Sequence, residues 1–295
     1  MSLVEQALKK LQAARGAVGA PASARAPAPR TASSGRQVPS NVPIPERPAR
    51  IVTVNRDALR IAGVLPPLQE ERRIAQQYRQ IKRPLVDNAL GRGVPQLPNG
   101  HLIMLASALP GDGKTFTSVN LALSLALEKD VNILLVDADV PKPHISRIFG
   151  VESEPGLLDV LRDEQLDPES VVLSTDVPNL TILPAGRASE TATELLASAR
   201  MGDVVHRLGS VDPNRIVLFD SPPLLLTTES RALASVVGQV VLVVSAGSTP
   251  QKAVFDALEL LGEGKSIGLV LNGCDDLQRA EYYNYYGQTD IKEGT

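Results

Sequence analysis

The chain has 295 residues and a formal net charge of −3, which is enough length for one sizeable α/β domain with appended segments. Its single cysteine excludes a disulfide within the chain, as expected in a reducing compartment. No run reaches the roughly 18 apolar residues that would span a bilayer. We therefore expect any membrane contact to be made through a partner.

Charge is distributed unevenly along the chain. Residues 1–50 carry eight basic and two acidic side chains, a net charge of +6, so the remainder carries −9. A basic arm on an acidic body predicts an anionic partner for the arm, either a membrane surface or a protein, and a solvated linker is the alternative. We expect no nucleic-acid partner.

Three segments are expected to precede the main domain. Within residues 1–15, Ser2 and Glu5 form a capping box ahead of apolar residues at helical spacing, which predicts a short amphipathic helix. Residues 16–48 are rich in Pro, Ala, Ser and Arg, a composition that predicts a disordered linker. Residues 49–95 are interpreted as a helical lead-in and oligomerisation segment, whose charged helix at 68–88 is kinked or ended by Pro84.

Apolar strands alternate with helices across residues 96–276, the predicted kinase domain. The expected strands are 102–106, 133–136, 180–184, 216–219, 240–244 and 267–271, and the expected helices include 115–127, 194–209 and 251–261. Continuous apolar strands separated by helices predict a mostly parallel, doubly wound sheet with helices on both faces. The fold class is α/β, and ligands are expected at the carboxyl ends of the strands.

The sequence ALPGDGKT at residues 108–115 follows a strand and opens a helix, which is the context of a P-loop in NTPases. Gly111 and Gly113 allow the backbone N–H groups to face phosphate oxygens. Lys114 is expected to reach the β- and γ-phosphates of ATP, and the Thr115 hydroxyl to ligate Mg²⁺. The expected ATP-binding residues here are Pro110, Gly111, Asp112, Gly113, Lys114, Thr115 and Phe116.

Two other strands end in aspartate, at Asp137 with Asp139 and at Asp220. Carboxylates at these strand ends, beside a P-loop, predict a site for magnesium and a catalytic base, whereas a lone one would often be a helix cap. Asn272 follows the last strand, and it either hydrogen-bonds an adenine edge or is a turn residue.

Four of the five tyrosines, Tyr282, Tyr283, Tyr285 and Tyr286, lie in the polar segment 277–295. Beside a P-loop, such a flexible tyrosine-rich tail predicts phosphoacceptor sites, and an aromatic patch for packing or partner binding is the alternative. Phosphorylation would add a charge of roughly −1.5 to −2 at each site. Because a tail that leaves its domain can reach a neighbouring active site, we expect transfer between subunits.

Together, the P-loop, the Asp137-Ala138-Asp139 element and the Asp220 element resemble the bacterial tyrosine kinases, or BY-kinases. The sequence is more similar still to the exosortase-associated tyrosine autokinases of exopolysaccharide systems, at residues 2–7, 78–85 and 238–241. This resemblance implies that Lys114, Asp137 and Asp139 are catalytic, with Asp137 the base for the tyrosine hydroxyl. It also implies Thr115, Asp139 and Asp220 as the residues at magnesium.

The resemblance further implies a role in regulating exopolysaccharide polymerisation or export. The partners would be an integral inner-membrane polysaccharide co-polymerase or activator and a cognate tyrosine phosphatase, with the chain cytoplasmic and peripheral to the inner membrane. A Glu-x-x-Arg-x-x-Arg helix assembles the family into rings. The matching positions here are Gln76, Arg79 and Lys82, so two of the three differ, and a homo-oligomer is left open.

Two other functions share these motifs. A switch ATPase of the MinD/ParA kind has the same fold and aspartates, but it carries a lysine early in the P-loop where this chain has Leu109. The other alternative is an ATP-binding regulatory module of a membrane polysaccharide transporter. The appearance of phosphotyrosine with purified protein and ATP alone would distinguish the kinase from both.

Overall fold

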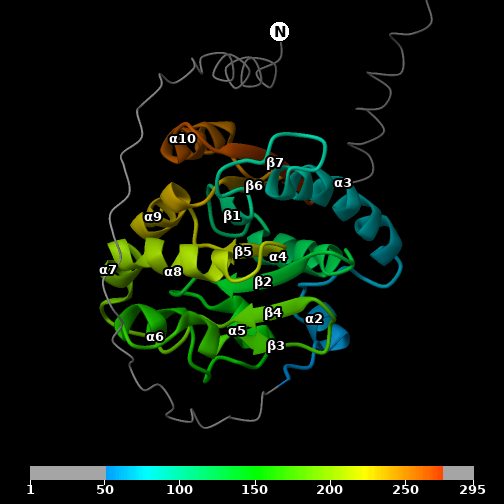
Figure 1. Cartoon of the computed structure of the whole chain (residues 1–295). Coiled ribbons are helices and arrows are strands. Elements are labelled where there is room, and N and C mark those ends of the chain that lie inside the picture. Colours follow the sequence, from blue (N-terminus) through cyan, green and yellow to red (C-terminus); the bar gives the residue numbers. More distant parts are fainter. Residues whose placement is uncertain (1–50, 275–295) are drawn as a thin grey trace, which may run out of the picture. The chain divides into compact units, whose positions relative to one another are not determined.

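The structure is a computed structural model and describes residues 51–274 (Figure 1). The predicted amphipathic helix (1–15), the linker (16–48) and the tyrosine-rich tail (277–295) lie outside the described residues. None of the helices in residues 51–274 has the length and apolar character needed to cross a membrane.

A seven-stranded sheet forms the centre of the described part, in the order β3-β4-β2-β5-β1-β6-β7. Only the β3–β4 pair is antiparallel; the other neighbouring strands are parallel, as the continuous apolar strands predicted. The connection after β1 leads to β2 and the connection after β5 leads to β6, so the direction of winding reverses between the neighbouring strands β1 and β5. Folds of this kind bind ligands at the carboxyl ends of the strands at such a point. The strands are β1 (Leu102–Ser107), β2 (Asn132–Asp137), β3 (Leu173–Ser174), β4 (Leu180–Leu183), β5 (Arg215–Asp220), β6 (Gln239–Ser245) and β7 (Ser266–Asn272).

Helices cover both faces of this sheet, which confirms the predicted doubly wound α/β fold. On one face lie α2 (Arg56–Ile61), α3 (Glu71–Leu90), α4 (Lys114–Leu125) and α5 (His144–Ile148). On the other lie α6 (Leu157–Arg162), α7 (Ala192–Leu196), α8 (Ala199–Ser210), α9 (Thr228–Val236) and α10 (Gln251–Leu261). A short 3-10 helix, η1 (Pro168–Val171), precedes β3.

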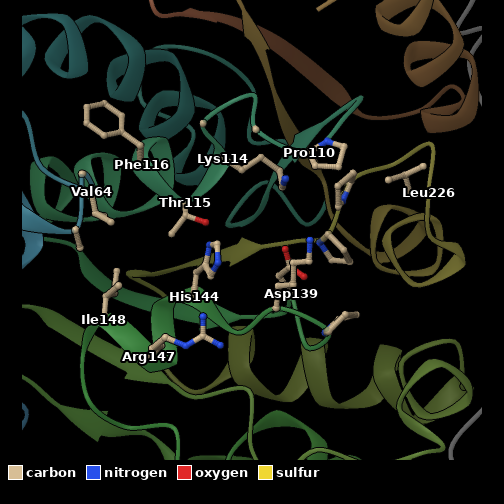
Figure 2. Close-up of a pocket in the computed structure, with 18 of the residues that line it drawn as sticks. Val64, Pro110, Lys114, Thr115, Phe116, Asp139, His144, Arg147, Ile148 and Leu226 are labelled. Atoms are coloured by element: carbon tan, nitrogen blue, oxygen red, sulfur yellow. The ribbon is translucent and has the colours of Figure 1, made fainter.

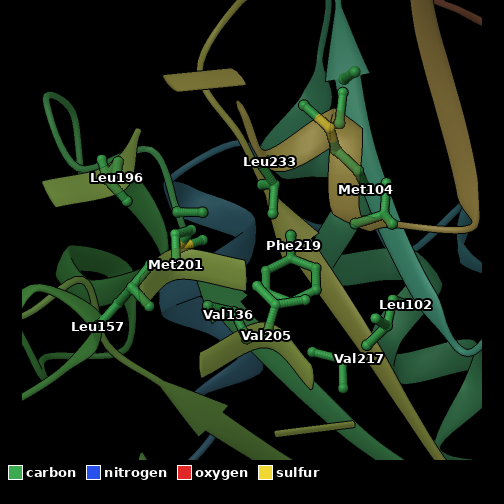
Figure 3. Packing of buried hydrophobic residues seen from close by; sticks show 14 of the residues in the cluster. Leu102, Met104, Val136, Leu157, Leu196, Met201, Val205, Val217, Phe219 and Leu233 are labelled. Atoms are coloured by element: carbon green, nitrogen blue, oxygen red, sulfur yellow. The ribbon is translucent and has the colours of Figure 1, made fainter. Parts of the chain in front are cut away.

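The two sides of each central strand feed two hydrophobic cores. In β1, Leu102 and Met104 enter the core under α6–α10, while Ile103 and Leu105 enter the core under α2–α5. This alternation is the two-residue period of a strand with both faces buried. Figure 3 shows the first core around the fully buried ring of Phe219.

The lead-in segment contributes to the second core. Leu59 of α2 and Leu85 of α3 are buried in the same cluster as the central strands. The Val52 N–H also donates to the Ser174 carbonyl at 2.8 Å, next to the edge strand β3. The segment from residue 51 onward is therefore packed against the sheet and helps to position α4, which carries the P-loop lysine.

Two predicted helix boundaries are wrong. Pro84 does not end α3. The helix continues to Leu90, because the turn after the proline buries Val86 and Ala89. The helix instead ends at Gly91, whose φ of 68° is left-handed. The single helix predicted at 194–209 is two helices, α7 and α8, because Ser198 is extended and its hydroxyl donates to the Leu195 carbonyl at 2.6 Å.

Candidate functional site

The predicted P-loop connects β1 to α4 at the centre of the sheet. Gly111 and Gly113 have φ angles of 87° and 93°, a left-handed conformation that side chains with a Cβ rarely adopt. Gly113 is the N-cap of α4, so the free N–H groups of the first helical turn face the loop. Lys114 is buried, and its Nζ donates to the Ser107 hydroxyl at 3.1 Å.

A hydrogen bond within the loop and contacts from the ends of two other strands hold this loop in place. Within the loop, Asp112 is buried and its Oδ2 accepts the Leu109 N–H at 3.1 Å. The Thr249 hydroxyl, after β6, donates to Asp112 Oδ1 at 2.6 Å. The Asn272 side-chain amide, at the end of β7, donates to the Asp112 carbonyl at 3.1 Å. The structure therefore places Asn272 against the P-loop backbone.

Asp220 lies directly below the first turn of α4. Its two carboxylate oxygens accept hydrogen bonds from the Thr115 and Ser118 hydroxyls, each at 2.8 Å. Burial raises the pKa of Asp220 to about 6, although the nearby charge of Lys114 and these hydrogen bonds oppose the rise. Thr115 and Asp220, predicted to share a magnesium site, are thus brought together.

Asp137 is paired in register with Asp220 on the neighbouring strand and is fully buried. Its Oδ2 accepts hydrogen bonds from the Ser146 N–H and hydroxyl, both at 2.7 Å. Its Oδ1 is buried and makes no hydrogen bond within the described residues. Burial raises the pKa of this carboxyl to about 7, against the lowering effect of Ser146 and with a further rise from Asp220.

A pocket of about 600 Å³ is lined by residues of the P-loop, by Asp139 and by residues of α5. Figure 2 shows Lys114 and Thr115 on one side of it and His144 and Arg147 on the other. Asp139 lines the pocket, and its pKa is raised by burial while Lys114 lowers it. Of the predicted site residues, Pro110, Gly111, Gly113, Lys114, Thr115, Phe116 and Asp139 line this pocket; Asp112, Asp137, Asp220 and Asn272 lie outside its lining.

Sequence reasoning missed several residues of the site. Ser118 was detectable, because it lies one helical turn after Lys114 and so shares its side of α4. Ser146 was not, because its contact with Asp137 depends on how α5 packs at the strand end. His144 also lines the pocket, together with Lys142, Arg147, Val64 and Pro222. The predicted phosphoacceptors Tyr282, Tyr283, Tyr285 and Tyr286 lie outside the described residues.

A P-loop between a central parallel strand and a helix, with carboxylates at the neighbouring strand ends, defines a P-loop nucleotide-binding protein. Comparison with known families agrees, since the AAA domain family matches residues 100–253. The chain is also 31% identical over 218 residues to the tyrosine-protein kinase YwqD of Bacillus subtilis, covering 73% of this chain and 87% of YwqD. The chain belongs to the AAA domain family and, within it, to the bacterial tyrosine-protein kinases.

Two further similarities extend this assignment. The solved kinase domain of VpsO is 30% identical, with a TM-score of 0.57, and the match covers 71% of this chain and all of that domain. The succinoglycan biosynthesis transport protein ExoP of Rhizobium meliloti is 32% identical over 213 residues, which cover 66% of this chain. The match spans only 27% of ExoP, so the chain corresponds to one part of that longer protein.

Proposed function

We propose that this chain is an ATP-dependent protein-tyrosine autokinase that phosphorylates Tyr282, Tyr283, Tyr285 and Tyr286. The observation that carries the proposal is the position of Lys114 and Thr115 on a pocket that also exposes Asp139, in a chain that belongs to the bacterial tyrosine kinases. A pocket of about 600 Å³ has room for phosphate groups together with an aromatic side chain.

In this proposal, ATP binds with its β- and γ-phosphates on the amides after Gly111 and Gly113 and on Lys114. The Lys114 side chain is already held over the loop by Ser107, so little ordering is needed when phosphate arrives. Asn272 supports the loop from β7 through an N–H donated to the Asp112 carbonyl, and the second N–H and the oxygen of the same amide can contact an adenine edge without breaking that bond.

The oxygen atoms available at the strand ends fit a magnesium ion. Mg²⁺ is usually held by hydroxyl or carboxylate oxygens together with substrate phosphates and water. The Thr115 hydroxyl and Asp220 carboxylate are in contact, and Asp139 lines the adjoining pocket. The ion would neutralise charge on the transferred phosphoryl group.

For transfer, the tyrosine oxygen bonds to the γ-phosphorus while the bond from that phosphorus to the β–γ bridging oxygen breaks. ADP leaves with the electron pair, and the phenolic proton passes to a base. We assign this proton to Asp137, whose Oδ1 is unpartnered within the described residues and whose pKa is raised to about 7. Because Asp137 does not line the pocket, the proton reaches it through a water or after a small movement of the side chain.

The autokinase is tested by incubating the full chain with magnesium and ATP labelled on the γ-phosphate, beside the Lys114→Ala variant. Label in tyrosine that disappears in the variant supports the proposal. ATP hydrolysis without labelled tyrosine would favour the switch ATPase. The absence of both hydrolysis and labelled tyrosine would favour a regulatory binding module.

Transfer between subunits is a separate part of the proposal. Tyr282 lies ten positions after Asn272, which is beside the P-loop, a span of at most about 36 Å when extended. Reach alone therefore permits transfer within one chain as well. Diluting the protein should slow phosphorylation per molecule, and a rate independent of concentration would show transfer within the chain.

We further propose that the kinase acts on exopolysaccharide polymerisation or export through an inner-membrane co-polymerase or activator, at the cytoplasmic surface. The similarity to the biosynthesis transport protein ExoP supports this context. A cognate phosphatase would reset the phosphorylated tyrosines, and a homo-oligomer would bring tails and active sites together. Co-sedimentation of the chain with membranes only when the partner is expressed would test the membrane location.

A further inference from the structure

A group of basic side chains faces the P-loop across the pocket. Lys142, His144 and Arg147 are all exposed and line the pocket. Figure 2 shows His144 and Arg147 on the side formed by α5. We call these three residues the cationic rim. The side chains of the rim make no hydrogen bond or ion pair with other residues of the range 51–274.

Other arginines near the sheet are used structurally. Arg215 forms an ion pair with Glu169 at 2.6 Å, and Arg60 pairs with Glu71 at 2.9 Å. Arg147 and Lys142 instead keep their charges available to the pocket. Among the described residues that line this pocket, Asp139 is the one carboxylate, and the charges of Lys142 and His144 lower its pKa against the effect of burial. The pocket therefore has more positive charge than the loop lysine alone provides.

The proposed acceptor sequence carries negative charge beside its tyrosines. Glu281 immediately precedes Tyr282, and the segment 275–295 has five acidic and two basic side chains, a net charge of −3. The tyrosines are adjacent or two residues apart, so one that has been phosphorylated places about −1.5 to −2 charge next to the following acceptor. Arginine binds carboxylate and phosphate oxygens through paired N–H groups, and lysine binds them as a point charge.

We propose that Lys142 and Arg147 recognise negative charge beside the acceptor tyrosine, so that a phosphotyrosine already present accelerates phosphorylation of its neighbour. This inference rests on the proposed kinase function and concerns the acceptor side of the same pocket. Its consequence is that the four tyrosines are modified in a sequential, self-reinforcing way, with Glu281 supplying the first negative contact.

The alternative use of the rim is direct contact with the phosphates of ATP. The two uses differ in the kinetic parameter they change. A rim that binds the acceptor determines the KM for peptide and the ratio of kcat/KM between two peptides. A rim that binds ATP determines the KM for ATP and changes the kcat/KM of all peptides by the same factor.

The test uses the full chain with Tyr282→Phe, Tyr283→Phe, Tyr285→Phe and Tyr286→Phe as the enzyme, so that only added peptide accepts phosphate. Two synthetic peptides carry the sequence 275–295 with Tyr285 as the single acceptor. In one, position 283 is phenylalanine, and in the other it is phosphotyrosine; the remaining two tyrosines are phenylalanine in both. A third peptide adds Glu281→Gln to the first. Values of kcat/KM are compared among them.

With the rim intact, we expect the phosphopeptide to be preferred about ten-fold, as surface charge pairs of ~1 kcal/mol or slightly more would give. The Glu281→Gln peptide should fall by about two- to three-fold. Arg147→Glu in the same enzyme should remove the preference, while Arg147→Lys should keep part of it. Lys129→Glu, a matched charge reversal at an exposed lysine outside the pocket lining, should preserve it.

Each outcome decides one point. Equal kcat/KM for the two Tyr285 peptides, or a preference that survives Arg147→Glu, would overturn the acceptor role of the rim while leaving the kinase intact. A higher KM for ATP in Arg147→Glu, with the peptide ratio unchanged, would overturn it in favour of ATP contact. No transfer to any peptide by the enzyme with an intact rim, or by the full chain to itself, would overturn the kinase function and this inference together.

Discussion

Replacing the buried carboxyl of Asp137 with an amide should stabilise the protein above neutral pH. Asp137 is fully buried beside Asp220, and burial raises its pKa to about 7, from the 3.8 expected when the chain is unfolded. Between these values the folded chain holds a proton that the unfolded chain has released. The stability contributed by this proton is fully present below about pH 4 and is lost as the pH rises through 7.

The size of the effect follows from the two pKa values. A difference of about three units corresponds to roughly 4 kcal/mol, of which about 1–2 kcal/mol is already lost by pH 5. Asp137→Asn removes the charge but keeps an oxygen that can accept the Ser146 N–H. The variant should therefore gain about 2–3 kcal/mol more over the wild type at pH 8 than at pH 5.

Urea unfolding of the full chain, without nucleotide or magnesium, measures this difference at the two pH values. Asp130→Asn is a matched control, because Asp130 is exposed and should show no comparable change. The same Asp137→Asn variant should lose phosphoryl transfer if Asp137 is the base, so that stability and activity move in opposite directions. An equal gain or loss of stability at both pH values would refute the buried, protonated carboxyl.

Three other substitutions test the site and the core. Gly113→Ala should abolish ATP binding, measured by calorimetry, because its Cβ would lie 2.0 Å from Asn272 Nδ2 at a φ of 93°; unchanged affinity would contradict the loop geometry. Thr249→Val should weaken ATP binding by about 1–2 kcal/mol, because the hydroxyl bond to the buried Asp112 is lost, and full affinity would show that this bond does not hold the loop. Phe219→Ala should lower the free energy of unfolding by about 3–5 kcal/mol in urea, and a loss below 1 kcal/mol would contradict the tight packing of this core.

Much of the fold could be predicted because its signals are local. The run 108–115 contains its own glycines, lysine and threonine, and the flanking strand and helix are visible as an apolar run and a helical pattern. The strands of the sheet are likewise recognisable in the sequence as continuous apolar runs, since both of their faces are buried. For these features the interactions that decide the structure lie within about 15 residues of one another.

The remaining features depend on contacts between distant parts of the chain. Pro84 disfavours a helix locally, but burial of the following turn in the core under α2–α5 outweighs that local cost. Asn272 contacts the P-loop across 160 positions of sequence, which only the strand order β1-β6-β7 brings about. The role of the rim residue Arg147 also depends on its position in the fold. The sequence shows only an arginine, and it is the packing of α5 that places this side chain on the pocket.

The identity of the phosphate acceptor is the central claim, and intact-mass spectrometry of the full chain with magnesium and ATP tests it most directly. We predict mass increases in steps of one phosphate, up to four, that map to Tyr282, Tyr283, Tyr285 and Tyr286. Lys114→Ala should show none of these steps. ATP consumed by the wild-type chain without any added phosphate would contradict the autokinase and leave a P-loop ATPase in its place.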